Sequence, residues 1–307
     1  MKRLQWLCVC ALISGLAVGC GDDDAGGTPD SGGGEDTGMP PAPICPAAAP
    51  DTEGLMGECC YRSTNDAAAP TFRISGLSIA SPGSLASPIV RAALRDALDE
   101  ERFNWLISVT GAAADGDIMV STGYGNRNAD ATYSFTMDSA PMPGEADRWN
   151  PITLNGTLAG ETMTAPPIVG SFTVPIFEED GTTLAIELPL QAFEVQMATM
   201  SADRNCVGLR TGPAYDNTQG SIRTYMTVAD AMARRLVVGP IDNDLCSFTA
   251  NITGDGNDCS NVDQAMWTVK PDALCTGGVC EGGCDPDTTC NAWTIAGGFA
   301  AHSVTIN

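Results

Sequence analysis

The sequence predicts a mainly β (α+β) protein, an antiparallel β-sandwich or barrel-like domain with two short helices and a disulfide-rich C-terminal region. From residue 103 onward the chain consists largely of short segments with β character, separated by turn signals such as Gly125-Asn126-Arg127-Asn128. Two segments show instead the capping residues and the spacing of helices. Ten cysteines follow residue 44, and four of them crowd between Cys275 and Cys290.

The chain begins with the layout of an export signal. Lys2 and Arg3 precede an almost uninterrupted apolar run from Leu4 to Val18. The run ends at Gly19, which is followed by Cys20. The run is about fifteen residues long, which is shorter than the roughly 20 residues that a membrane-spanning helix needs. Residues 1–19 are therefore expected to be a cleaved signal peptide.

The end of this segment, Ala17-Val18-Gly19-Cys20, resembles the lipobox of bacterial lipoproteins, in which small residues precede an invariant cysteine. Ala17 stands at the position where leucine is commonest. The resemblance implies cleavage before Cys20, acylation of its thiol, as by palmitate, and attachment to the lipid bilayer. It implies a lipid-anchored protein of the cell envelope, at the outer membrane, facing the periplasm or the cell surface. The alternative is an ordinary secreted protein that is cut nearby.

Residues 20–44 are expected to form a disordered acidic tether. They are mostly Gly, Asp, Pro, Ser and Thr and show no apolar periodicity. Such a segment cannot bury enough surface to offset the entropy of ordering. As a coil of about 24 residues it would reach roughly 25–30 Å, which suits a domain held at a membrane.

The charge of the chain excludes one class of partner. The formal net charge is −23, and removal of residues 1–19 would take away Lys2 and Arg3 and leave Lys270 as the single lysine. So acidic a surface repels nucleic acid and anionic lipid headgroups. The partners that remain are the bilayer, through Cys20, and an unidentified protein or glycan.

Residues 45–242 are predicted to form the mainly β domain, beginning with a disulfide-stapled loop. From residue 71 to 79 apolar and polar side chains alternate with a slip at Gly76, which predicts a bulged strand. A helix is predicted over 88–102, because Ser87 suits the N-cap, Pro88 suits the first helical position, and apolar residues recur at three- and four-residue spacing.

Further strands follow from short segments with β character between turn signals. The segment Ile152–Leu158 contains Asn155-Gly156, a typical turn pair, so it is predicted to be either a strand or a hairpin tip. The segment from Thr183 to Met200 exceeds an ordinary strand, and Pro189 is predicted to bend it at an edge or a bulge. The predicted strands are Phe103–Thr110, Ile118–Tyr124, Ala131–Met137, Ile152–Leu158, Gly170–Phe177, Thr183–Met200, Cys206–Arg210 and Gly220–Met226.

A second helix is predicted over 228–238. Thr227 suits its N-cap, Asp230 stands at the capping-box position, and Gly239-Pro240 ends it. Residues 243–307 are predicted to be a disulfide-rich region that packs on the same domain, with a last strand between Trp293 and Ile306.

The cysteines of an exported chain are expected to form five disulfides. Neighbouring Cys59 and Cys60 are expected to pair with different partners, because a bond between adjacent residues strains the peptide. An all-thiolate zinc site is the alternative, although the usual paired knuckles are missing. The ten candidates are Cys45, Cys59, Cys60, Cys206, Cys246, Cys259, Cys275, Cys280, Cys284 and Cys290.

Few residues suggest catalysis or a cofactor. His302 is the single histidine, and no nucleophile-elbow sequence accompanies it, so a serine triad is not indicated. Acidic loops offer weak calcium ligands, but neither completes an EF-hand loop. These candidates are Asp242, Asp244, Asp255 and Asp258. No other metal or cofactor is expected.

Two functions remain. The first is a membrane-anchored exported lipoprotein that serves as a non-enzymatic binding or structural module at the cell envelope. The alternative is a carboxylate-dependent hydrolase that acts on carbohydrate, because such enzymes need only two suitably placed acids. Four tryptophans are candidates for a sugar-stacking face, but core packing is the default expectation. They are Trp105, Trp149, Trp267 and Trp293.

Overall fold

Antiparallel strands build the protein, which confirms the predicted fold class. The computed structural model describes residues 66–136, 149–177, 184–201, 204–208, 220–238, 241–254 and 257–307. The predictions for the signal peptide, Cys20, the tether, Cys45, Cys59, Cys60 and Asp255 lie outside these residues. None of the helices in the described part of the chain has the length and apolar character needed to cross a membrane.

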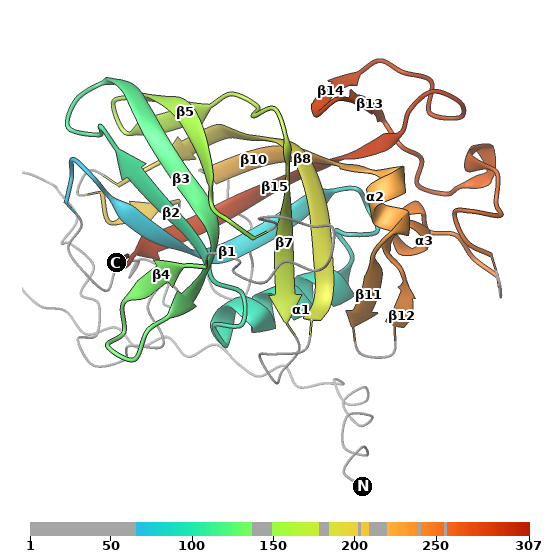
Figure 1. Ribbon diagram of the computed structural model, residues 1–307, viewed down its shortest axis with the longest axis horizontal. Helices are drawn as coiled ribbons and strands as arrows, with labels where there is room; N and C mark the ends of the chain where they lie inside the picture. The colour runs from blue at the N-terminus through green and yellow to red at the C-terminus, as the bar shows by residue number, and fades with distance from the viewer. Residues whose placement is uncertain are drawn as a thin grey trace, which may run out of the picture. The chain divides into compact units, whose positions relative to one another are not determined.

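The central strands close into a barrel (Figure 1). Each pairs antiparallel with the next in chain order, and β15 returns to pair with β1. Closure leaves no unpaired sheet edge in the barrel wall. The eight strands are β1 (Thr71–Ser81), β2 (Trp105–Thr110), β3 (Gly116–Arg127), β5 (Ile152–Ala159), β6 (Thr162–Ala165), β8 (Leu184–Thr199), β10 (Gly220–Thr227) and β15 (Ala292–Ser303).

Alternation of side chains along each strand fills the barrel interior. In β5, Leu154, Gly156 and Leu158 are buried while their neighbours are exposed. Gly156 therefore lies inside a strand and not at a hairpin tip. A Cβ at this position would lie 2.6 Å from the carbonyl oxygen of Thr164, so the close approach of β6 requires glycine here.

The sixteen-residue strand β8 reaches beyond the barrel. Its second half pairs with β6 and β10, and its first half pairs with β7 (Ser171–Phe177). The predicted bend at Pro189 is wrong, because Pro189 pairs regularly with Thr173. The irregularity falls at Ala192, which has φ 50° and donates its N–H to the carbonyl of Gly170.

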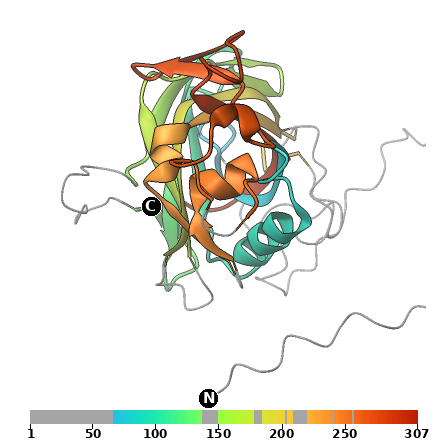
Figure 2. The ribbon, with the colours of Figure 1, turned by 90° about the vertical axis from the view of Figure 1, so that its right-hand side faces the viewer.

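Helix α1 (Pro88–Asp99) forms where the sequence predicts it and ends three residues early. The Ser87 side chain accepts a hydrogen bond from the Val90 N–H, and Leu94 and Leu98 lie on the buried face. Figures 1 and 2 show α1 against the barrel, near the ends of β7 and β8 in the first view.

The second predicted helix is wrong over its C-terminal half. Helix α2 spans Val228–Met232 with Thr227 as its cap, and Arg235–Val238 form strand β11 instead. β11 pairs with β12 (Ile241–Asp244), and its buried Leu236 lies opposite Ile186 of β8. Tertiary pairing of this branched, apolar segment outweighs its local helical pattern.

Helix α3 (Leu245–Ala250) follows β12 and was not predicted from the sequence. Asp244 is its N-cap and accepts a hydrogen bond from the Ser247 N–H at 2.7 Å. Four smaller elements complete the fold. They are β4 (Tyr133–Phe135), β9 (Cys206–Val207), the hairpin of β13 (Ala273–Thr276) with β14 (Val279–Gly282), and a 3-10 turn at Gln264–Met266.

The C-terminal region is rich in disulfides, as predicted. Its bonds join Cys246 to Cys259, Cys275 to Cys280 and Cys284 to Cys290, and Cys206 of β9 is disulfide-bonded as well. The bond between Cys275 and Cys280 joins residues that lie directly opposite each other in the β13–β14 hairpin.

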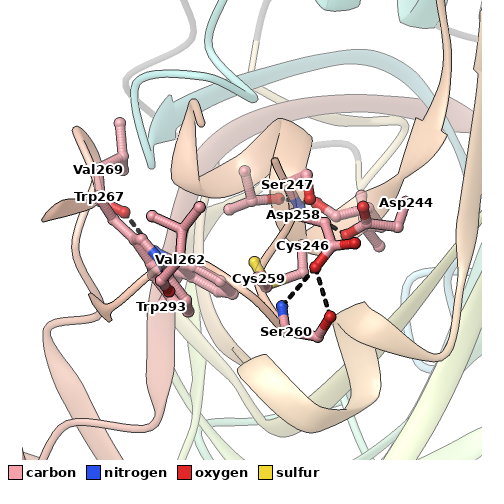
Figure 3. Close-up of a disulfide and its surroundings, with 12 residues drawn as sticks. Asp244, Cys246, Ser247, Asp258, Cys259, Ser260, Val262, Trp267, Val269 and Trp293 are labelled. Carbon is pink, nitrogen blue, oxygen red and sulfur yellow. Dashed lines mark hydrogen bonds between the residues drawn. A yellow bond between two sulfur atoms is a disulfide. The ribbon is translucent and has the colours of Figure 1, made fainter. Parts of the chain in front are cut away.

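A pair of tryptophans packs this region against the barrel (Figure 3). Trp267 stacks on Trp293 of β15 with ring centroids 5.8 Å apart and planes 20° apart. Trp293 donates its indole N–H to the carbonyl of Val269, and Trp267 donates to that of Val262. Both tryptophans therefore serve core packing, which favours that interpretation over a sugar-binding face.

Candidate ligand-binding cavities

The barrel encloses an apolar cavity of about 80 Å³, called here the barrel cavity. Aromatic rings form much of its wall. Phe172 lies between Trp105 and Phe193, with ring centroids 6.0 Å and 5.4 Å away respectively. Trp105 belongs to β2 and Phe193 to β8 of the barrel, and Phe172 comes from β7, which pairs with β8.

Both polar side chains that line the barrel cavity have their hydroxyl groups engaged. Thr122 accepts a hydrogen bond from the indole N–H of Trp105 at 2.6 Å and donates to the carbonyl of Leu106 at 2.9 Å. Thr224 donates to the carbonyl of Gln191 at 2.8 Å. The remaining lining side chains are apolar. Such a cavity gives a water molecule few partners and suits apolar matter.

A second cavity of about 370 Å³ lies beneath α1 and is called here the α1 cleft. Its volume falls within the roughly 300–1,000 Å³ of typical small-molecule sites. Residues from the turn before α1, from α1 itself, from β7, from the start of β8 and from β11 line it. The apolar part includes Leu85, Leu94, Phe177, Ile186 and Leu236.

The two cavities adjoin. Ile79, near the end of β1, and Leu188, in the projecting half of β8, line both of them. These two side chains therefore stand between the α1 cleft and the interior of the barrel.

Two charged side chains line the α1 cleft in the described part of the chain, one basic and one acidic. Arg102 pairs through Nε with Glu100 at 2.8 Å and donates from Nη1 to the carbonyl of Phe177 at 2.9 Å. Its side chain is 14 % exposed. Asp96 is 44 % exposed and lies 3.2 Å from Nε of Arg95. The pair of Asp96 with Arg95 is exposed, and such pairs contribute little to stability, so the Asp96 carboxylate remains accessible to a ligand. The Arg102 guanidinium is largely buried and engaged at Nε and Nη1, so a ligand competes with Glu100 for it.

The buried carboxylates lie elsewhere. Glu187 is 3.3 Å from Arg234 and accepts a hydrogen bond from the indole of Trp149, and Glu194 lies 2.7 Å from Arg223. Neither glutamate lines the barrel cavity or the α1 cleft, and Asp96 is the one carboxylate among the described residues that line them. A hydrolase of the type considered needs two carboxyl groups facing one cleft. The geometry of these two cavities therefore favours binding.

Of the four calcium candidates, the structure describes the side chains of Asp244 and Asp258, and each of them has partners in its own segment. Asp244 caps α3, and Asp258 accepts hydrogen bonds from Ser260 and Asn261 within its own turn. The Ser260 hydroxyl and the neighbouring N–H groups hold the pKa of the Asp258 carboxyl below its usual range. The side chain of Asp242 lies outside the described residues.

Asp244 does lie within 4.8 Å of the sulfur atoms of Cys246 and Cys259 (Figure 3). Those sulfurs are joined to each other, and a disulfide has no thiolate to offer a metal. The described cysteines of the C-terminal region thus form disulfides and not an all-thiolate zinc site. His302 is buried on β15, opposite Arg73 of β1, and lines neither cavity.

Sequence reasoning missed both cavities. It predicted the apolar alternation that lines the barrel and the helix that covers the cleft, but not the space between them. Among the candidate residues that the structure describes, Trp105 alone lines one of these two cavities. No protein-family model, curated protein or solved structure matches this chain.

Proposed function

We propose that the chain is an exported lipoprotein of the cell envelope, anchored through acylated Cys20, whose barrel is a non-enzymatic module that binds a small, mainly apolar ligand. The observation that carries the proposal is the apolar barrel cavity of about 80 Å³ that adjoins the α1 cleft of about 370 Å³. Concave, mainly apolar sites with a few polar groups are the usual form of a ligand site.

The chemistry of the walls favours an apolar ligand over a glycan. A sugar needs hydrogen-bond partners for its hydroxyl groups, and the hydroxyls of Thr122 and Thr224 are already engaged.

The disulfides support an exported location, because they persist in oxidising compartments. The tether and the lipobox-like segment supply the membrane attachment.

Replacing Cys20 with Ser is expected to move the protein from the membrane fraction to the soluble fraction. An acylated and cleaved cysteine carries two or three chains, and each buried methylene contributes about 0.8 kcal/mol to membrane binding. Fractionation with immunoblotting measures this, and intact-mass analysis of the wild type detects the acyl groups. Ser31→Ala, in the same tether, is the matched control and should stay with the membrane. Equal membrane retention of Cys20→Ser would contradict the anchor.

The purified mature protein is expected to bind the uncharged dye N-phenyl-1-naphthylamine saturably, with one site per chain. The rings of the dye suit the apolar wall of the α1 cleft, and its fluorescence rises on transfer from water to such a wall. Fluorescence titration measures the stoichiometry. A linear, non-saturating response from folded protein would contradict the binding function.

A further inference from the structure

We infer that the ligand is a single-chain amphiphile with a zwitterionic head group, whose alkyl chain runs from the α1 cleft past Ile79 and Leu188 into the barrel cavity. The inference rests on the proposed function and names the class of ligand. Three features carry it: the small apolar volume at one end of the site, the two lining residues that the adjoining cavities share, and the opposite charges in the cleft.

The narrow end admits only the tip of a thin chain. At about 80 Å³, the barrel cavity has roughly half the volume of an apolar cavity of about 150 Å³ that takes up benzene. Part of its wall is made of packed aromatic rings, since Phe172 of β7 makes a tilted contact with Trp105 of β2 and an edge-on contact with Phe193 of β8. A ring or a strongly branched group does not fit this space, whereas the last carbons of an alkyl chain do.

The wider cavity accommodates the rest of the molecule. Ile79 and Leu188 contact both spaces, so a chain that passes between them stays in apolar surroundings along its length. Each buried methylene adds about 0.8 kcal/mol, close to a fourfold change in affinity. The larger volume of the α1 cleft leaves room for the start of the chain and for the head group.

The charges in the cleft select the head group. Among the residues that the structure describes, Arg102 and Asp96 are the two charged side chains that line it. The Asp96 carboxylate repels an anionic head group, which must also compete with Glu100 for Arg102. The Arg102 guanidinium repels a cationic head group. A head that carries both charges complements both residues. The net charge of −23 adds a long-range bias against anionic ligands.

The test is displacement of bound N-phenyl-1-naphthylamine by four amphiphiles with the same dodecyl chain, each kept below its micelle concentration. The probes are dodecylphosphocholine, dodecanoate, dodecyltrimethylammonium and dodecanol. The zwitterion is expected to displace the dye at about tenfold lower concentration than the other three, because a charge-assisted contact contributes that much.

Charge variants separate the head-group contact from general apolar binding. Arg102→Gln and Asp96→Asn are each expected to remove the preference for dodecylphosphocholine over dodecanol, whatever they do to the affinity for the dye itself. Arg91→Gln makes the same charge change on the exposed side of α1, and the preference should survive it.

The path of the chain is tested by Leu188→Trp, which fills the junction of the two cavities. It should abolish the gain in affinity between hexyl and dodecyl phosphocholines, with Met119→Trp, on the exposed face of β3, as the control. Circular dichroism checks folding. Should Leu188→Trp not fold, the chain-length series on the wild type decides: about fourfold per added methylene is expected up to a limiting length.

The outcomes distinguish the two proposals. Absence of saturable dye binding overturns the proposed function. Saturable dye binding with equal displacement by all four head groups, or with dodecanoate preferred, overturns the zwitterionic ligand and leaves the binding function standing. Affinity that does not depend on chain length overturns the path into the barrel cavity.

Discussion

Replacing Arg73 with Leu is expected to lower the free energy of unfolding by about 3–5 kcal/mol. Arg73 lies on β1 and is 5 % exposed. Its Nε donates to Oδ1 of Asn104 and its Nη2 donates to the carbonyl of Leu98, both at 2.6 Å. Asn104 in turn donates to the carbonyl of Glu101 at 2.7 Å. The guanidinium thus connects β1 to the C-terminal end of α1 and to the segment that enters β2.

Loss of this guanidinium removes the donor to Oδ1 of Asn104 and one of the donors to the carbonyl of Leu98, which keeps the N–H of Glu101. An unsatisfied buried acceptor costs about 1–3 kcal/mol, and loss of the packing of the Arg73 side chain adds to it. Urea denaturation followed by circular dichroism measures the change. Arg95→Leu, at a partly exposed position on α1, is the control and should change stability by about 0.5 kcal/mol at most. Because Arg73 holds the helix that covers the α1 cleft, dye binding should weaken as well. A loss below about 1 kcal/mol would show that Arg73 does not hold α1 in place.

Replacing Trp293 with Ala is expected to cost about 3–5 kcal/mol, the usual range for removal of a buried aromatic side chain. Trp293 is 1 % exposed, and its indole stacks on Trp267 and donates to the carbonyl of Val269. The substitution removes the contact through which residues 257–270 pack on β15, so that stretch should loosen more than the barrel strands do.

Urea denaturation measures the global effect, and amide hydrogen exchange resolves the local one. Met266→Ala is the control, because Met266 belongs to the same stretch and is 76 % exposed. The expected pattern is faster exchange around Trp267 in Trp293→Ala and little change in the control. Equal stability of the two variants would refute the role of the tryptophan pair.

Local chemistry was sufficient to predict the elements whose signals are local. Ser87 and Pro88 mark the start of α1, and the structure places the helix there. Alternating segments predicted most barrel strands within a few residues. The choice between a sandwich and a barrel was out of reach, because closure depends on the pairing of β1 with β15, whose residues Phe72 and Ser303 lie at opposite ends of the described chain.

The errors arose where tertiary contacts outweigh a local pattern. Residues 235–238 continue a helical pattern, yet Leu236 is buried as a strand residue opposite Ile186. The cavities escaped prediction for a related reason. Their volume is the space that side chains from β1, β8, α1 and β11 fail to fill, and no single segment of sequence records it.

The most direct test of a chain-binding barrel uses the tryptophan in its wall. Trp105 lines the barrel cavity, whereas Trp149, Trp267 and Trp293 line neither cavity. Dodecylphosphocholine brominated at the end of its chain should quench wild-type fluorescence saturably, because bromine quenches an indole ring only at close contact. Trp105→Phe should lose most of that quenching and still bind the dye. Equal quenching of the wild type and Trp105→Phe would place the chain outside the barrel and contradict the account.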